Sequence, residues 1–158
     1  MPINGFNKTT LLDYPGKIAS TIFLGGCNFR CPFCQNSSLV LSPNKQPVIS
    51  TEEVLSVLKK RQGILEGVCI TGGEPTFDKD LFLLIDKIKE LGYPVKLDTN
   101  GSHPWILKKL VNDQMIDMVA MDIKSSKESY AKVSGCKNID LTSICESVEF
   151  LLSNVIPY

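Results

Sequence analysis

The sequence has almost no histidine, no net charge and no long apolar run. One of its 158 residues is histidine, and 17 basic side chains balance 17 acidic ones. Since no stripe of Lys and Arg is present, we expect no nucleic-acid partner bound by bulk electrostatic attraction. No apolar segment approaches the length of a membrane span, and the N-terminus lacks the pattern of a secretory signal peptide. We therefore expect no membrane partner either.

Cysteine is well represented, with six residues in a chain that shows no secretion signal. Such thiols indicate a reducing, cytoplasmic compartment, where they bind metals or act in catalysis rather than form disulfides. The length and the apolar content of 43% are typical of one soluble globular domain. We expect residues 1–158 to form a single domain, in which residues 1–16 are a lead-in.

Three of the cysteines, Cys27, Cys31 and Cys34, are spaced C-x3-C-x2-C. They follow an apolar, β-branched run and the pair Gly25-Gly26, which places them on a loop after a strand. Three thiolates on one loop can bind three irons of a 4Fe-4S cluster, and the fourth iron then has no cysteine from the motif. An unfilled metal position distinguishes a reactive site from a structural one.

A zinc site or a redox dithiol is the alternative, because residues 31–34 alone form a C-x-x-C pair. A structural zinc ion needs a fourth ligand, and no remaining candidate lies at motif spacing. Read singly, Cys69 and Cys145 are core residues, His103 begins a helix, and Cys136 has no assigned role. The C-x3-C-x2-C spacing is uncommon for zinc or dithiol sites, so it favours the cluster.

Apolar periodicity predicts an alternation of strands and helices. We expect strands near residues 17–24, 67–71, 94–97 and 117–121, helices over 50–62 and 78–91, from Pro104 and around 144–151, a loop over 35–49, and the start of a fifth strand at 155–156. This alternation predicts a parallel sheet with right-handed crossovers. The polar and glycine-rich motifs all follow strands, and the active sites of such α/β folds lie at the carboxyl ends of the strands.

Three strand ends after the cysteine loop carry groups that suit a ligand. Gly72-Gly73 lets a ligand approach the main chain closely, and the carboxylate of Glu74 suits a ligand amino group. The segments 98–100 and 122–124 offer hydroxyl, carboxylate and ammonium groups that suit a ribose or an amino-acid carboxylate. Tight or capped turns and a solvated lysine explain the same residues without a ligand.

Taken together, these motifs resemble those of the radical S-adenosylmethionine superfamily. Within it, the chain is most similar to glycyl-radical-enzyme activases, specifically those that activate anaerobic ribonucleoside-triphosphate reductases. The matching segments are 13–16, 26–36, 71–75, 97–102 and 120–124. The resemblance implies an α/β fold, a partial (incomplete) parallel α/β barrel. Because family members usually continue with a further strand and helix, we expect the barrel to be cut short at strand five, near Tyr158.

The resemblance also implies the ligands of the site. Cys27, Cys31 and Cys34 would bind a 4Fe-4S cluster, whose open iron would chelate S-adenosylmethionine through its amino and carboxylate groups. The residues implied in contacts with that cofactor are Phe33 near the adenine, Gly72, Gly73 and Glu74 near the methionine amino end, and Asp98, Thr99, Asn100, Asp122 and Lys124 near the carboxylate and ribose. A monovalent cation would lie among Asp98, Thr99 and Asp122. No further catalytic side chain is expected.

The implied reaction is reductive cleavage of S-adenosylmethionine to methionine and a 5′-deoxyadenosyl radical, which takes hydrogen from a glycine of a partner enzyme. The implied partners are therefore a glycyl radical enzyme, of the anaerobic ribonucleotide reductase type, and an electron donor of the flavodoxin or ferredoxin type. An anaerobic cytoplasm would protect the open cluster from oxygen. Two alternatives stay open: a radical S-adenosylmethionine enzyme that acts on a small molecule of the deazapurine type, and a non-catalytic zinc or thiol-redox domain.

Overall fold

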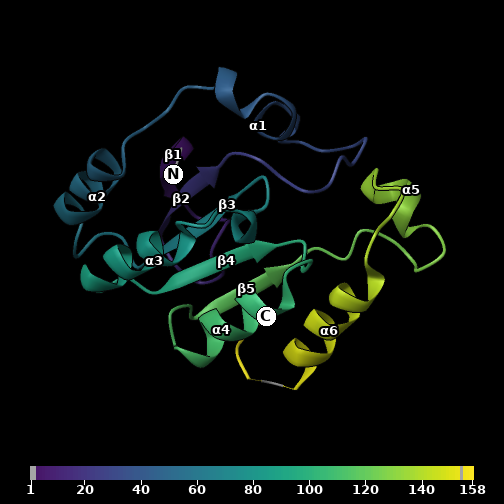
Figure 1. The fold of residues 1–158 in the computed structure, drawn as a ribbon. Coiled ribbons are helices and arrows are strands. Elements are labelled where there is room, and N and C mark those ends of the chain that lie inside the picture. Colours follow the sequence, from purple (N-terminus) through teal and green to yellow (C-terminus); the bar gives the residue numbers. More distant parts are fainter. Residues whose placement is uncertain (1–2, 154) are drawn as a thin grey trace.

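The computed structural model describes residues 3–153 and 155–158, and it contains a five-stranded sheet with helices (Figure 1). The strands are β1 (Ile3–Thr10), β2 (Ala19–Leu24), β3 (Gly67–Gly72), β4 (Val95–Thr99) and β5 (Met118–Met121), and they lie in this order across the sheet. Strands β2 to β5 are parallel, as predicted, whereas β1 pairs antiparallel with β2. The architecture is that of a partial parallel α/β barrel.

Longer helices follow the parallel strands and cover one face of the sheet. They are α2 (Thr51–Lys60), α3 (Leu81–Glu90), α4 (Pro104–Asn112) and α6 (Leu141–Leu152). Local sequence explains their ends: the Ser50 hydroxyl accepts a hydrogen bond from the Glu53 N–H (3.1 Å), and Pro104 occupies the first turn of α4. Gly92 follows α3 with φ of 82°, as expected of a glycine that terminates a helix. None of the described helices is long and apolar enough to cross a membrane.

The two faces of the sheet differ in character. Apolar strand residues pack against the helices, among them Ile22, Ile70 and Leu97, and form the main core. The opposite face carries the row Thr21, Cys69 and Lys96, which are neighbours in register on β2, β3 and β4. Because strand residues alternate between faces, a buried polar row can lie directly behind an apolar core.

Three sequence predictions about local structure are wrong. Residues 1–16 include the strand β1, which their many polar side chains concealed and which is stabilised by pairing with β2. The predicted loop 35–49 contains the short helices α1 (Ser37–Leu41) and η1 (Pro43–Lys45). The predicted fifth strand at 155–156 is absent: the Val119 N–H donates to the Pro157 carbonyl (3.0 Å), but a proline has no N–H with which to extend a ladder.

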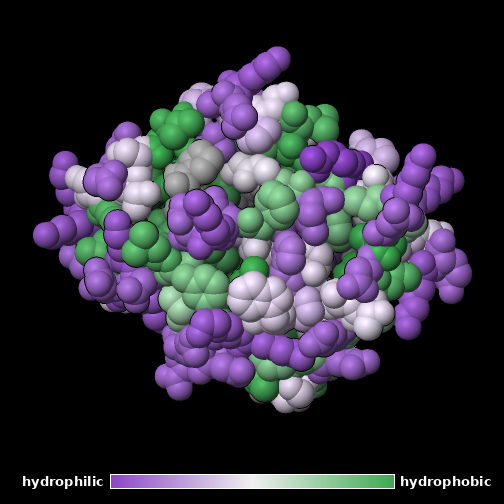
Figure 2. Space-filling view, viewed as in Figure 1, coloured by the Kyte–Doolittle hydropathy of each residue, from purple (hydrophilic) through white to green (hydrophobic). Residues whose placement is uncertain are grey.

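Two short helices lie between strands and longer helices. The 3-10 helix η2 (Pro75–Phe77) follows β3, and α5 (Tyr130–Ser134) lies in the connection between β5 and α6. Helix α5 packs on the loop after β2, where the Arg30 N–H donates to the Ser134 carbonyl (2.8 Å). Hydrophilic side chains gather along the edge of the molecule that α5 forms (Figure 2). At this edge, α5, which belongs to the last third of the chain, therefore lies against the loop that carries the motif cysteines.

Candidate functional site

A cavity of about 380 Å³ lies at the carboxyl ends of the parallel strands. It is lined by all twelve residues that the sequence singled out: Cys27, Cys31, Phe33, Cys34, Gly72, Gly73, Glu74, Asp98, Thr99, Asn100, Asp122 and Lys124. Its size falls within the range of sites for small molecules and cofactors. The sequence predicted these residues on four separate loops, and the fold brings them together.

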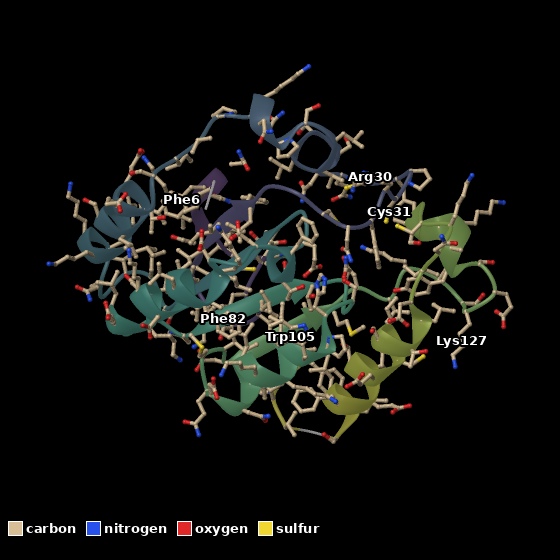
Figure 3. The ribbon with its side chains drawn as sticks, viewed as in Figure 1. Phe6, Arg30, Cys31, Phe82, Trp105 and Lys127 are labelled. Carbon is tan, nitrogen blue, oxygen red and sulfur yellow. The ribbon has the colours of Figure 1, made fainter. Side chains whose placement is uncertain are left out.

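The cysteine loop is stabilised by contacts on both sides. The Gly26 N–H donates to the Leu39 carbonyl of α1 (2.9 Å), and the Cys136 thiol donates to the Asn28 carbonyl (3.2 Å). Cys136, like Cys27 and Cys31, packs against a buried cluster of Phe29, Tyr130 and Ile144, a position that its sequence did not indicate. All three motif cysteines are free thiols and half-buried, and Figure 3 shows Cys31 on the loop near α5.

The protein itself does little to favour thiolates at Cys27 and Cys31. Burial raises the pKa of the Cys27 thiol to about 11, although the Phe29 N–H, which donates to its sulfur, opposes the rise. Burial also raises the pKa of Cys31. A thiol in such surroundings becomes a ligand when a cation is bound to it, because the cation stabilises the thiolate.

Among the described residues, no group of three or more His, Cys, Asp or Glu side chains is placed to hold one metal ion. A structural zinc site requires such a group. A cluster that takes one thiolate on each of three irons does not require sulfurs that converge on one point.

Glu74 is almost completely buried, with 1% exposure, and its carboxylate accepts four hydrogen bonds from the protein. It accepts bonds from the Thr76 N–H (3.0 Å) and hydroxyl, the Thr99 hydroxyl (2.8 Å) and the Asn100 N–H (2.6 Å). Burial raises the pKa of Glu74, although these bonds oppose the rise. Three of these donors share Oε1 and only the Asn100 N–H reaches Oε2, so the side chain joins the loops after β3 and β4 and Oε2 keeps an acceptor position. Its predicted contact with a ligand amino group stays a prediction.

The two glycines before Glu74 allow two loops to approach each other. A Cβ on Gly73 would lie 1.8 Å from the Gly26 carbonyl oxygen, which accepts a hydrogen bond from the Glu74 N–H (2.8 Å). Gly72 has φ of 120°, and a Cβ there would lie 2.3 Å from the Leu24 carbonyl oxygen. The sequence assigned these glycines to ligand approach, and the structure adds a second reason for them.

Side chains after β4 connect the cavity floor to the cysteine loop. The Asn100 side-chain amide donates to the Asn28 Oδ1 (2.9 Å), and the Asn28 amide donates to the Ser102 hydroxyl (2.8 Å). Asp98 forms an ion pair with Lys96, whose side chain is 8% exposed. Sequence reasoning missed Asn28 and Lys96. The position of Asn28 inside the cysteine motif, and a lysine in an otherwise apolar strand, were the signals available.

The mouth of the cavity combines one ion pair with exposed apolar groups. Lys124 Nζ lies 2.8 Å from Asp122 Oδ2. Burial lowers the pKa of Lys124, but the pair with Asp122 more than offsets this, so the pKa is raised. Phe33 and Ile123 are 59% and 63% exposed. The three residues predicted to bind a monovalent cation have other partners here, since Asp98 contacts Lys96, Asp122 contacts Lys124, and Thr99 contacts Glu74.

Two predictions about residues outside the motif are confirmed. Cys69 is fully buried within β3. His103 precedes α4, and its Nδ1 lies 2.9 Å from the Thr76 hydroxyl.

Comparison with known proteins agrees with this geometry. The radical SAM superfamily profile matches residues 21–157. A Methanocaldococcus jannaschii protein named as a candidate glycyl-radical enzyme activating enzyme, MJ1227, is 35% identical over 136 residues, which are 85% of this chain and 55% of that protein. The 7-carboxy-7-deazaguanine synthase of Halobacterium salinarum is 32% identical over 106 residues, or 65% of this chain and 40% of the synthase.

A solved structure of TYW1 with a lysine-pyruvate adduct bound is similar in fold, with a TM-score of 0.60 and 18% sequence identity. The similarity covers 85% of this chain and 52% of that one. This chain thus spans about half the length of the proteins that it matches.

Proposed function

Because the chain belongs to the radical SAM superfamily, we propose that its cavity binds a 4Fe-4S cluster and S-adenosylmethionine and serves to form a glycyl radical on a partner enzyme. The observation that carries the proposal is the meeting of three C-x3-C-x2-C thiols and nine further predicted residues in one cavity. Held by Cys27, Cys31 and Cys34, a cluster would supply single electrons for the reductive cleavage of S-adenosylmethionine, and the bound S-adenosylmethionine would supply the group that accepts a hydrogen atom from a glycine Cα.

The chemistry of the donor set fits these cofactors. Three thiols, with the carboxyl groups of Glu74, Asp98 and Asp122, line the cavity, and Lys124 is the one cationic side chain that lines it among the described residues. The iron–sulfur core of a cluster and the sulfonium group both carry positive charge, which the three thiolates and these carboxylates can balance. Cys27, Cys31 and Cys34 would be the cluster ligands.

The remaining residues of the cavity would bind and orient the two cofactors. The hydrogen bonds of Asn100 and Asn28 hold the cysteine loop at a defined position over the strand ends. The pairs of Asp98 with Lys96 and of Asp122 with Lys124 fix two carboxylates and one ammonium group where a ribose and a methionine carboxylate would lie. Phe33 would cover the adenine and exclude water. The protein thus supplies position and a dry site, while the cofactors supply the reactive chemistry.

A protein substrate is supported by the similarity to MJ1227 and by the mouth of the cavity, where Phe33 and Ile123 expose apolar surface that a peptide loop would cover. An anaerobic ribonucleotide reductase is the partner that the resemblance of the segments 13–16, 26–36, 71–75, 97–102 and 120–124 implies. The second candidate is a small-molecule substrate of the deazapurine type, which the similarity to 7-carboxy-7-deazaguanine synthase supports.

The first test is anaerobic reconstitution with iron and sulfide, followed by dithionite and S-adenosylmethionine. We expect a brown protein that releases 5′-deoxyadenosine. Cys31→Ala should lose both the colour and the product. Cys145→Ala, a half-buried cysteine on α6, is the matched control and should keep both. A colourless wild type that binds one zinc ion would overturn the proposal.

The second test separates the two substrates. An anaerobic ribonucleotide reductase added to the reconstituted protein should acquire a glycyl radical, seen as an electron paramagnetic resonance doublet. Product release without that radical would refute the activase function and leave the cofactor chemistry standing. A deazapurine precursor consumed in the same assay would favour the second candidate.

A further inference from the structure

The side-chain amide of Asn100 is held in one orientation beside the cysteine loop. Asn100 is 5% exposed, and its Oδ1 accepts a hydrogen bond from the Ser102 N–H (2.9 Å). Because a backbone N–H can only donate, this bond fixes which end of the amide is the oxygen and which is the nitrogen. The nitrogen therefore faces the cysteine loop, where it donates to Asn28 Oδ1 (2.9 Å) and lies 3.9 Å from Cys27 Sγ.

The Cys27 sulfur has two N–H donors around it. The Phe29 N–H donates to it over 3.3 Å, and Asn100 Nδ2 approaches it to 3.9 Å. Among the described residues, no N–H group of another residue donates a hydrogen bond to the sulfur of Cys31 or Cys34. The three motif sulfurs therefore have different surroundings, although their spacing in the sequence does not distinguish them.

The second hydrogen of the Asn100 amide is placed for the thiolate form of Cys27. A neutral thiol is a weak acceptor, and that of Cys27 also donates to Asn28 Oδ1 over 3.9 Å. A cysteine that binds a metal has lost its hydrogen, so its sulfur can only accept. A charged acceptor forms shorter and stronger hydrogen bonds than a neutral one. This sulfur and Asn28 Oδ1 are the acceptors that Asn100 Nδ2 has within the described part of the chain.

We propose that Asn100 raises the reduction potential of the centre held by Cys27, Cys31 and Cys34 by donating its side-chain N–H to the Cys27 thiolate. The inference rests on the proposed function, which assigns a 4Fe-4S cluster to these cysteines. Hydrogen bonds to the sulfurs are among the properties that set the reduction potential of such a cluster. A reduced cluster carries one more negative charge than an oxidised one, so a donor at its sulfur stabilises the reduced state more.

Asn100 acts through Cys27 and is therefore a positioning residue, a role that adds to the cofactor contact predicted from the sequence. Its main chain has a separate partner, since the Asn100 N–H donates to Glu74 Oε2 (2.6 Å). Side-chain substitutions leave this main-chain bond in place. They can thus test the contact with sulfur without removing the contact with Glu74.

The test compares variants of Asn100 and Asn28 in the anaerobically reconstituted protein. Asn100→Ala removes the donor to sulfur and, with it, the bond to Asn28. The matched control, Asn28→Ala, removes the same bond between the loops and keeps the Asn100 amide. Asn100→Asp keeps an acceptor for the Ser102 N–H but has no side-chain N–H, so it replaces the alanine variant if that variant fails to fold. Circular dichroism and the iron and sulfide content establish that each variant is folded and loaded.

A redox titration followed by electron paramagnetic resonance measures the potential. At a fixed solution potential, we expect the ratio of reduced to oxidised cluster to fall about tenfold in Asn100→Ala, which is about 59 mV for a one-electron couple. Asn100→Asp should fall at least as far, because its charge also disfavours the reduced state. Asn28→Ala should stay within about twofold of the wild type. Electron–nuclear double resonance in D₂O should show a deuterium coupling that both Asn100 variants lose and Asn28→Ala retains.

Two outcomes overturn the inference. An unchanged potential in the loaded Asn100 variants would show that the amide does not tune the cluster, whatever the deuterium couplings. If Asn28→Ala lowered the potential as much as Asn100→Ala, the effect would come from the position of the loop and not from the N–H. Failure of the proposed function is recognised separately, because the wild type would then show no signal of a reduced 4Fe-4S cluster or would release no 5′-deoxyadenosine.

Discussion

Replacing Glu74 by glutamine tests whether this carboxylate serves the protein or a ligand. Glutamine has nearly the same shape, but it has one acceptor oxygen, and its amide nitrogen is a donor. If its oxygen takes the place that faces Thr76 and Thr99, the amide nitrogen faces the Asn100 N–H, which now donates to Glu74 over 2.6 Å. The buried Asn100 N–H then loses its acceptor, and the hydrogen bonds from Thr76 and Thr99 go to a neutral oxygen instead of a charged one.

The expected cost follows from these contacts. A buried donor left without a partner costs about 1–3 kcal/mol, and a hydrogen bond to a neutral acceptor is weaker than one to a charged group by roughly 1 kcal/mol. Removing a buried charge relieves part of this, because burial raises the pKa of Glu74. We expect the free energy of unfolding to fall by about 2–4 kcal/mol. For a domain of this size, that is a fall in Tm of about 4–16 °C.

Urea unfolding of the anaerobically purified protein, followed by circular dichroism, measures the change. Glu146→Gln is the matched control, since Glu146 is half-exposed and pairs with Lys108 at the surface. Its cost should be below about 1 kcal/mol. Equal midpoints for the two variants would refute the structural role of Glu74. If Glu74→Gln instead kept its stability and lost affinity for S-adenosylmethionine, the carboxylate would face the ligand, as the sequence suggested.

Three further changes test other contacts. Gly73→Ala places a Cβ against the Gly26 carbonyl and should cost about 1–3 kcal/mol in urea unfolding; an unchanged midpoint would show that the loops do not touch. Lys96→Met removes the partner of Asp98, and a double-mutant cycle with Asp98→Asn should give a coupling energy of about 0.5–3 kcal/mol, whereas a value near zero would exclude the ion pair. Hydrogen bonds from Ser143 hold the pKa of Asp140 below its ordinary value of 3.8. The contribution of Asp140 to stability is therefore present above pH 3.8 and is lost as the pH falls through the lowered pKa. The Asp140→Ala variant should have a lower free energy of unfolding at neutral pH, and this free energy should fall less steeply in acid than that of the wild type. Parallel curves of unfolding free energy against pH for the two proteins would contradict this.

Periodicity predicted the strands and helices of the parallel sheet because burial on one face leaves a local pattern. The apolar positions of α3, for example, are Leu81, Leu84, Ile85 and Ile88, and all are buried. The same reasoning failed for β1, whose stability comes from pairing with β2 rather than from its own side chains. It also failed at residues 155–156, which form no strand. There the Val119 N–H of β5 donates a hydrogen bond to the Pro157 carbonyl, instead of the series of bonds that joins two strands.

The sequence predicted which residues would gather at the candidate site, but it did not predict the contacts between them. Motif spacing identified the thiols and the polar strand ends, because a parallel sheet necessarily collects its strand ends at one edge. The partners of Glu74, by contrast, come from loops up to 26 residues away, and no local pattern indicates whether a carboxylate points into a cavity or into the protein.

The sequence by itself determined the cysteine spacing, the alternation of strands and helices and therefore the edge at which the site forms, since each of these depends on neighbours within a few residues. Only the tertiary structure decided that Glu74 accepts hydrogen bonds from the loops after β3 and β4, that Lys96 lies buried beside Asp98, and that α5 packs on the cysteine loop. Each of these depends on contacts between segments far apart in the chain. The free energy of such contacts cannot be predicted from residues that are neighbours in the sequence.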